Sequence, residues 1–359
     1  MNAAYIHIPF CQAICSYCDF PKFFYNENWV DQYLNILKDE INQTYKGEIL
    51  KTIYIGGGTP SCLNLKQLKK LMDIISLFKT DNPEITMEVN IENITTDKLE
   101  IIKNKVNRIS IGIQSFNEDV KLYLKRHHKN EETKEKIKLI KNMGFNINVD
   151  LIYAVENQTL DDLKKDLDEF IKLDVNHIST YSLIIEPKTK LYISKKENID
   201  EQLDYEMYEY IKSKLKENNY IHYEISNFSK EGFCSKHNLV YWNNEEYYGF
   251  GLGASGYINK TRYENTKSLN KYLNKEFIFE SHLLDIKEQI ENELILGFRK
   301  IKGINKEIFF KKYNKNLIEM FNIKKLIEEG KLIENNEYIY ISEKYLYVQN
   351  DILINFIGE

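Results

Sequence analysis

Three cysteines near the N-terminus have the spacing of an iron–sulfur ligand set. Cys11, Cys15 and Cys18 form a CxxxCxxC pattern and are three of the five cysteines in the chain. Structural zinc sites generally use four protein ligands, and electron-transfer ferredoxins supply four cysteines to each cluster. Three thiolates can instead hold three irons of a cubic 4Fe-4S cluster and leave the fourth iron open to another ligand. The spacing alone leaves a partial zinc knuckle as the alternative.

The elements that position these cysteines alternate between apolar runs and amphipathic stretches over the first 220 residues. Pro9 ends the first predicted strand, so the cysteines fall in the loop that follows it. The predicted strands are Tyr5–Ile8, Thr52–Ile55, Ile85–Val89, Arg108–Ile113, Asn146–Ile152 and His177–Ile184. The predicted helices are Trp29–Thr44, Leu65–Phe78, Thr96–Asn104, Asn117–Met143 with a break near His127–Asn130, Leu160–Leu173 and Glu201–Glu217. Six such units predict a parallel sheet, which right-handed crossovers curl into a barrel or part of one.

Polar residues and glycines gather where these strands end. Gly56, Gly57, Gly58 and Thr59 follow the second strand, and the later strand ends carry Glu88, Asn90, Gln114, Asp150, Tyr181 and Ser182. Functional groups of such barrels lie at the carboxyl ends of the strands. Glycines there allow a ligand to approach the backbone closely, although a tight turn needs them too. The alternative to a ligand-binding role is an ordinary solvated position. It applies to these polar side chains and to Arg126, which stands beside two histidines.

Residues 219–265 are rich in aromatic, Gly and Asn residues, which predicts strands and loops rather than helix. They contain His237-Asn-x-x-Tyr241-Trp242, in which an imidazole lies near two large rings. This pattern fits a core aromatic cluster with a hydrogen-bonded histidine, and it also fits an axial haem ligand beside rings that stack on a porphyrin. Isolated cysteines such as Cys62 and Cys234 are ordinarily small buried hydrophobes, with a metal or haem role open for Cys234.

The C-terminal part returns to a helical pattern from about residue 283. The predicted helices are Ile286–Arg299, Lys306–Tyr313 and Leu317–Glu329, followed by a hairpin whose turn is Glu334–Glu337. This order indicates a small winged-helix-like α+β module. Acidic and basic residues are about equal in number here, which favours a structural or partner-binding cap over a DNA reader. We therefore expect three parts, at residues 1–220, 221–282 and 283–359.

The composition narrows the class of protein. The formal net charge is −5 over 359 residues, which gives no electrostatic argument for nucleic acid as a partner. No apolar run approaches the roughly 18 residues that span a bilayer, and the N-terminus lacks a secretory pattern. Three clustered cysteines among five fit a reducing compartment, so we expect a cytoplasmic protein.

The motifs together resemble the radical S-adenosylmethionine superfamily. CxxxCxxC with Tyr17 before the last cysteine, followed by Gly-Gly-Gly-Thr-Pro, is its signature, and Tyr-Ile-His-Ile-Pro-Phe-Cys resembles the oxygen-independent coproporphyrinogen III oxidase-like (HemN-like) family. The resemblance implies an α/β fold with a partial (β/α)6 TIM barrel and a 4Fe-4S cluster whose open iron binds S-adenosylmethionine. It places around that ligand Tyr5, Tyr17, Gly57, Gly58, Thr59, Glu88, Gln114, Arg126, Asp150 and Ser182.

Two branches of this family differ just beyond the third cysteine. The oxidases carry a further cysteine two places on, where this chain has Phe20. Cys-Asp-Phe and the His-Asn-x-x-Tyr-Trp motif resemble instead the HemW branch, which is regarded as haem chaperones. That resemblance implies haem as cargo, apo-haemoproteins as recipients, a reductant as electron donor, and haem-binding roles for His237, Asn238, Tyr241 and Trp242. The alternative function is oxygen-independent coproporphyrinogen III dehydrogenase in porphyrin biosynthesis.

Two departures from the family pattern, and some questions of assembly, stay open. The family commonly has Gly-Leu-Pro where this chain has Ala154-Val155-Glu156. The departure leaves open whether the loop after the fifth strand serves cofactor binding as it does in the family. Ser255 replaces a histidine often found in Gly-Ala-His-Gly, which removes one candidate haem or metal ligand. The sequence decides neither a homodimer nor transient association with a membrane. It also does not decide whether S-adenosylmethionine is cleaved.

Overall fold

The computed structural model describes residues 1–357, and its centre is a curved sheet of nine strands. The strand order is β11-β1-β4-β5-β6-β7-β8-β10-β9. The six central strands are all parallel and correspond to the six predicted ones: β1 Ala3–Ile8, β4 Leu50–Gly57, β5 Thr80–Val89, β6 Arg108–Gln114, β7 Asn146–Tyr153 and β8 His177–Ser182. The predicted partial barrel of six parallel strands is confirmed.

The sheet is extended at both edges by strands from the aromatic region. At one edge β11 (Tyr248–Phe250) pairs parallel with β1. At the other edge β10 (Asn227–Ser229) pairs antiparallel with β8, and β9 (Ile221–Glu224) pairs with β10. The main sheet therefore draws strands from beyond residue 220.

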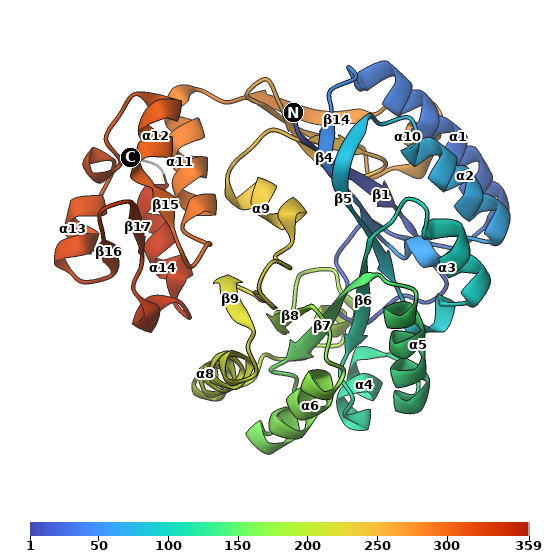
Figure 1. Cartoon of the computed structure of the whole chain (residues 1–359), viewed down its shortest axis with the longest axis horizontal. Helices are drawn as coiled ribbons and strands as arrows, with labels where there is room; N and C mark the ends of the chain where they lie inside the picture. Colours follow the sequence, from blue (N-terminus) through green and yellow to red (C-terminus); the bar gives the residue numbers. More distant parts are fainter. Residues whose placement is uncertain (358–359) are drawn as a thin grey trace.

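Helices cover the outer face of this sheet (Figure 1). They are α1 Glu27–Thr44, α2 Leu65–Ile75, α3 Thr96–Ile102, α4 Glu118–Leu124, α5 Asn130–Asn142, α6 Leu160–Lys172 and α8 Glu201–Glu217. Their starts carry the expected caps: the Asn64 side chain accepts from the Gln67 N–H, and Thr159 caps α6 in the same way. The predicted break between α4 and α5 is confirmed, because Lys125 ends α4 in a left-handed conformation with φ 57°.

The core lies between the helices and the sheet. The β6 side chains Ile109, Ile111 and Ile113 are fully buried and point toward the helices. The alternate positions, Arg108, Ser110 and Gln114, point into the space that the sheet curves around. The same division holds on β7, where Val149 and Leu151 belong to the hydrophobic core. Burial of the aliphatic rows thus fixes the register that turns the polar rows inward.

The remaining elements form the rest of the molecule. They are β2 Phe10–Cys11, β3 Phe23–Phe24, α7 Lys190–Ile193, α9 Lys236–Trp242, β12 Ser255–Ile258, β13 Thr261–Asn265, α10 Leu269–Leu273, β14 Ile278–Leu283, α11 Ile286–Gly297, β15 Ile304–Asn305, α12 Lys306–Tyr313, α13 Ile323–Glu328, β16 Leu332–Glu334, β17 Tyr338–Ile341 and α14 Gln349–Leu353. The predicted hairpin is present as β16 and β17, and β15 completes a three-stranded sheet beside α11–α13. No helix in the described range combines the length and the apolar character needed to cross a bilayer.

Two secondary-structure predictions were wrong. The stretch 219–265 was expected to hold strands and loops only, yet Lys236–Trp242 forms the helix α9, capped by the Ser235 side chain. Two turns of helix are too short to show a hydrophobic period in the sequence. The predicted helix Leu317–Glu329 is split into a 3-10 turn at Leu317–Glu319 and α13, because Phe321 between them has φ 41°.

Candidate functional site

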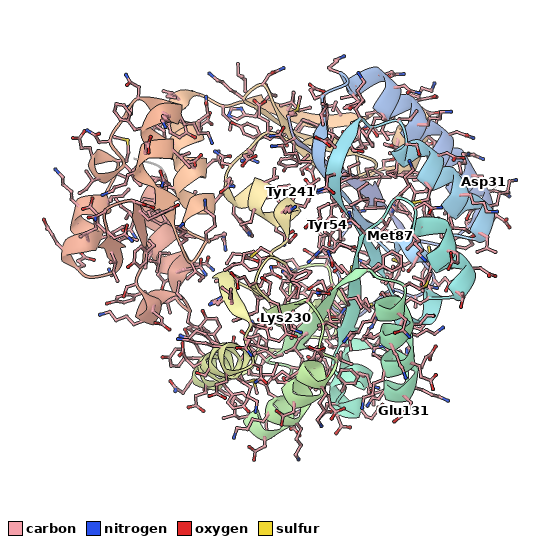
Figure 2. All side chains as sticks on the ribbon, in the orientation of Figure 1. Asp31, Tyr54, Met87, Glu131, Lys230 and Tyr241 are labelled. Carbon is pink, nitrogen blue, oxygen red and sulfur yellow. The ribbon has the colours of Figure 1, made fainter. Side chains whose placement is uncertain are left out.

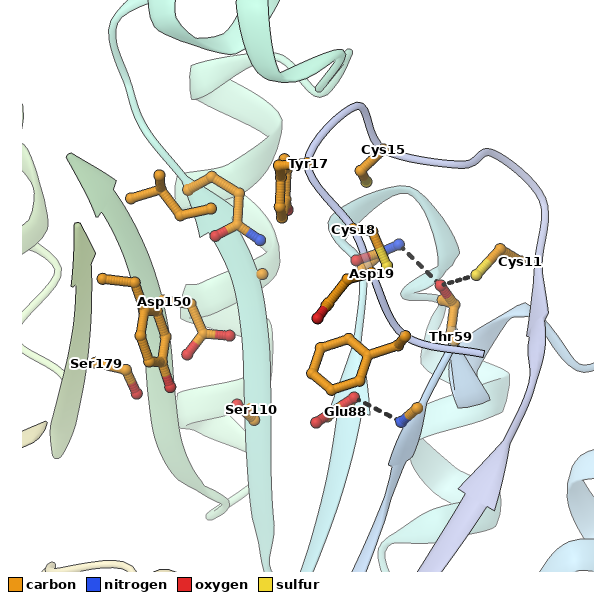
Figure 3. A pocket seen from close by; sticks show the side chains of 18 of the residues that line it. Cys11, Cys15, Tyr17, Cys18, Asp19, Thr59, Glu88, Ser110, Asp150 and Ser179 are labelled. Carbon is orange, nitrogen blue, oxygen red and sulfur yellow. Dashed lines mark hydrogen bonds between the residues drawn. The ribbon is translucent and has the colours of Figure 1, made fainter. Parts of the chain in front are cut away.

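A cavity of about 440 Å³ occupies the hollow of the curved sheet (Figure 3). Its lining comes mainly from strands β4–β8 and from the loop that carries the cysteines, with Arg126 after α4 and Asn238 of α9. Thirteen of the predicted site residues line it: Cys11, Cys15, Tyr17, Cys18, Gly57, Gly58, Thr59, Glu88, Gln114, Arg126, Asp150, Ser182 and Asn238. Four predicted residues do not line it: Tyr5, His237, Tyr241 and Trp242. Residues far apart in the sequence are thus brought to one space by the parallel sheet.

Backbone hydrogen bonds close the cysteine loop at its base. Strand β2 (Phe10–Cys11) pairs with β3 (Phe23–Phe24), and the Tyr25 N–H donates to the Cys11 carbonyl at 2.8 Å. The ammonium group of Lys22 donates to the Cys18 carbonyl at 2.6 Å. The loop between the two short strands is therefore held at the mouth of the cavity.

The three cysteine thiols are buried or half-buried and line one cavity. Cys15 and Cys18 are half-buried, and burial raises the pKa of the Cys11 thiol to about 11. Within residues 1–357, no three His, Cys, Asp or Glu side chains are arranged to hold one metal ion. A cubane cluster makes no such demand, because each thiolate binds a different iron. Three cysteines facing one cavity fit that group, and its iron requires the thiolate forms.

The glycine loop after β4 lies directly against the cysteine loop. The Thr59 N–H donates to the Phe10 carbonyl at 2.8 Å, and its hydroxyl donates to the Cys11 sulfur at 3.5 Å. A Cβ atom on Gly58 would lie 2.8 Å from the Phe10 carbonyl oxygen. Gly57 has φ 113°, a conformation that side chains rarely adopt. The glycines are thus required for the approach of the two loops.

Arg126 and Gln114 present unpaired polar atoms in the buried part of the cavity wall. Arg126 donates to the Gly112 carbonyl at 2.6 Å and to the Cys15 sulfur at 3.5 Å, while its Nε atom has no partner. Gln114 has φ 70°, and its buried Oε1 atom also has no partner. Buried polar atoms are seldom left unsatisfied, and strained backbone clusters at ligand sites. These atoms are suited to bind a polar ligand beside the cysteines.

Two acidic residues lie deeper in the cavity. Glu88 accepts hydrogen bonds from the Tyr54 hydroxyl at 2.8 Å and the Gly57 N–H at 3.0 Å. Burial raises the pKa of Glu88 to about 7 and that of Asp150 to about 6. Near neutral pH the Glu88 carboxyl is therefore partly protonated and can both donate and accept. Such a group suits the hydroxyls of a ribose.

Two predicted ligand-binding residues have protein partners instead of free polar groups. The Tyr5 hydroxyl is hydrogen-bonded to His7 Nδ1 at 2.9 Å, and its ring stacks on Tyr54. The Ser182 hydroxyl, although it lines the cavity, donates to Asp204 at 2.7 Å. Tyr5 thus lies one layer behind the cavity wall.

Several cavity residues had not been singled out from the sequence. They are Tyr54, Arg108, Ser110, Asn148 and Ser179, together with Lys22 from the cysteine loop. A signal for the strand residues was present, because polar side chains recur at every second position of otherwise aliphatic strands. In Arg108-Ile-Ser110-Ile-Gly112-Ile-Gln114 the polar row and the aliphatic row alternate.

Helix α9 packs against the opposite end of the strands from the cysteines. The His237 N–H donates to Glu84 on β5 at 3.1 Å, and its Nδ1 atom is hydrogen-bonded to Thr52 on β4 at 2.9 Å. The His237 ring contacts the rings of Tyr54 and Tyr241, two residues that Figure 2 labels. Asn238 of the same helix lines the cavity. The cysteine loop and the His-Asn-x-x-Tyr-Trp helix therefore border one cavity from opposite ends.

Comparison with known proteins assigns the family. Residues 5–170 match the family model of the Radical SAM superfamily. The chain is 40% identical to the Heme chaperone HemW of Bacillus subtilis over 100% of both chains. It is 38% identical to the Heme chaperone HemW of Lactococcus lactis, over 99% of this chain and 97% of that one.

A solved structure shares the fold. The coproporphyrinogen III oxidase (HemN) of Escherichia coli superimposes with a TM-score of 0.87 at 21% identity, covering 99% of this chain and 90% of that one. At that identity the likeness bears on fold alone, and full-length sequence similarity decides the branch. The chain belongs to the HemW branch of the HemN-like family within the radical S-adenosylmethionine superfamily.

Proposed function

We propose that this protein is a haem chaperone, which binds haem and transfers it to apo-haemoproteins on a radical S-adenosylmethionine scaffold. The observation that carries the proposal is end-to-end similarity to proteins named Heme chaperone HemW. Phe20 supports the proposal, because the oxidase branch carries a cysteine at that place. A phenylalanine there, 58% exposed, offers an apolar surface instead of a thiol.

Cys11, Cys15 and Cys18 would hold a 4Fe-4S cluster, and S-adenosylmethionine would bind beside it. Such a cluster, once bound and reduced, would supply one electron to the sulfonium of S-adenosylmethionine. Arg126 and Gln114 have unpaired atoms suited to the methionine end, and Glu88 and Asp150 would bind the ribose. The remaining positions offered for this ligand are Tyr5, Tyr17, Gly57, Gly58, Thr59 and Ser182.

The haem site would use helix α9. His237 is the proposed axial ligand, with Asn238, Tyr241 and Trp242 around it. Both imidazole nitrogens are occupied, by Thr52 and by Tyr241, and burial lowers the pKa of His237 to about 3. The imidazole is therefore neutral, as ligation requires, but one hydrogen bond must open first.

The partners follow from the same proposal. They are haem, recipient apo-haemoproteins and a reductant, in the cytoplasm, without nucleic acid. Residues 1–220 would carry the cluster, residues 221–282 the haem motif, and residues 283–359 a capping module. A homodimer and transient docking to membrane-bound recipients belong to the same hypothesis.

The test is anaerobic reconstitution of the full chain with iron and sulfide, followed by haem titration, transfer of haem to an apo-haemoprotein, and an assay with coproporphyrinogen III. We expect about four irons per chain, stoichiometric haem uptake, transfer to the recipient and no protoporphyrinogen. Cys15→Ser should lose the cluster, whereas Cys234→Ser, whose thiol contacts Ser229, should keep it. Formation of protoporphyrinogen would overturn the proposal in favour of the dehydrogenase, and absence of haem uptake would reject the chaperone.

A further inference from the structure

Arg108 reaches the cavity from the end that lies away from the cysteines. It is the first residue of β6, whereas Gln114 is the last. Six residues of strand at about 3.3 Å each separate the two Cα atoms by roughly 20 Å. The Arg108 side chain lines the cavity and is only 4% exposed. A guanidinium is always charged and carries five N–H donors, so this end of the cavity holds a permanent buried cation.

This cation lacks a hydrogen-bonded or ion-paired partner in the part of the chain that the structure describes. Among residues 1–357, the Arg108 side chain donates no hydrogen bond and forms no ion pair, in contrast to Arg126 at the other end. Its charge acts on its neighbours through space: it acts to lower the pKa of the buried Asp150 carboxyl and of His177 and His237, although burial is the larger influence on each. A buried charge without a partner is costly, so proteins seldom keep one without a use.

The neighbouring polar groups are already bonded to one another. The Tyr54 hydroxyl donates to Glu88 at 2.8 Å, and Asn148 donates to Asp150 at 2.9 Å. His177 is hydrogen-bonded to the Tyr223 hydroxyl at 2.8 Å. None of these hydrogen bonds involves Arg108, whose side chain lines the cavity.

We propose that Arg108 binds a carboxylate of a ligand held in this cavity. The inference rests on the proposed function, which brings two sources of that group: the propionates of haem and the methionine carboxylate of S-adenosylmethionine. A guanidinium pairs with a carboxylate through two parallel hydrogen bonds. The opposite end of the cavity already offers Arg126 to the methionine. Arg108 lies instead on the side of helix α9, whose Asn238 lines the same cavity.

The test compares Arg108→Gln with the wild-type chain in two titrations. In the first, haem is compared with haem dimethyl ester, whose propionates are blocked, by the change in Soret absorbance. In the second, S-adenosylmethionine is compared with its decarboxylated form by calorimetry. Arg262→Gln, a change outside the cavity, is the matched control, and Arg108→Lys keeps the charge without the paired donors. Thermal unfolding checks that each variant is folded.

We expect wild-type protein to prefer the carboxylate form of one ligand by roughly tenfold to a hundredfold, the range of hydrogen bonds to charged groups. Arg108→Gln should abolish that preference, Arg108→Lys should keep part of it, and Arg262→Gln should keep all of it. The titration in which the preference disappears identifies the source of the carboxylate. An unchanged preference in both titrations in folded Arg108→Gln overturns the inference; where that variant does not fold, an unchanged preference in folded Arg108→Lys does so, because lysine lacks the paired donors. Failure of wild-type protein to bind haem rejects the proposed function instead, and the S-adenosylmethionine titration then decides the role of Arg108.

Discussion

The Nε2 atom of His237 lies 2.8 Å from the hydroxyl oxygen of Tyr241, one helical turn further along α9. Both ring nitrogens therefore have a hydrogen-bond partner, since Nδ1 is hydrogen-bonded to the Thr52 hydroxyl. A histidine that binds iron needs one of these nitrogens free. The Tyr241 hydroxyl is the partner on its own short helix, so a rotation of one side chain would release Nε2.

Replacing Tyr241 with phenylalanine should therefore strengthen haem binding. The variant keeps the ring but removes the competing hydroxyl, whose hydrogen bond is worth about 0.5–1.5 kcal/mol, so the affinity should rise roughly twofold to tenfold. His237→Ala should weaken binding, and Tyr205→Phe, on a distant helix, should leave it unchanged. Haem titration followed by Soret absorbance measures all three. Weaker haem binding by a fully folded Tyr241→Phe would mean that the hydroxyl itself contacts the haem.

Arg126 should be required for the binding of S-adenosylmethionine. It crosses from the end of α4 to the Gly112 carbonyl and the Cys15 sulfur, and lysine cannot present two donors in one plane. Arg126→Lys should weaken that ligand at least about tenfold, measured by calorimetry on reconstituted protein. His127→Gln, a change at the neighbouring exposed position, is the control. Equal affinities of the two variants for S-adenosylmethionine would show that Arg126 does not contribute to binding this ligand.

The stability of the fold should depend on pH through Glu40, which lies outside the cavity. Glu40 accepts hydrogen bonds from Gly251, Tyr272 and Asn265, and burial raises its pKa from 4.5 to about 7. The folded state therefore keeps a proton that the unfolded chain loses above pH 4.5. The stabilisation is complete below that pH and is lost as the pH rises through 7, at most about 3 kcal/mol.

Glu40→Gln should flatten this part of the pH profile of the free energy of unfolding. Urea unfolding at pH values between 4.5 and 8 would measure the slope, with the exposed Glu135→Gln as the control. An identical slope in Glu40→Gln and wild-type protein would show that this carboxyl does not titrate during unfolding.

Ala154 carries backbone strain that a family-like residue would relieve. It is buried and has φ 60°, in the left-handed region that favours glycine, and the family commonly has glycine there. Ala154→Gly should raise the free energy of unfolding by up to about 1 kcal/mol, since a left-handed alanine costs roughly 1–2 kcal/mol and glycine loses part of the gain through its freer unfolded chain. Ala254→Gly, at a buried alanine without positive φ, should lower it. Destabilisation by both changes would contradict the assignment of strain.

The alternation of apolar and amphipathic runs was enough to predict the six parallel strands and most of the helices, because strands that bury a row of side chains under helices carry apolar residues, and the covering helices are amphipathic. It was not enough for α9 or for the split before α13. Those depend on a local cap at Ser235 and a left-handed Phe321, which leave no periodic trace.

By itself the sequence determined which residues to look for near the N-terminus: the three cysteines, the adjoining glycines and the polar strand ends are local patterns, and they lie together around one cavity. Only the tertiary structure decided what surrounds His237 and Arg108, because their neighbours come from strands and helices far away in the chain. Both ring nitrogens of His237 are hydrogen-bonded, to Thr52 and to Tyr241, whereas Arg108 is buried without a hydrogen bond or ion pair to any described residue. Whether a buried polar group is satisfied depends on contacts across the fold, and no spacing along the chain records them.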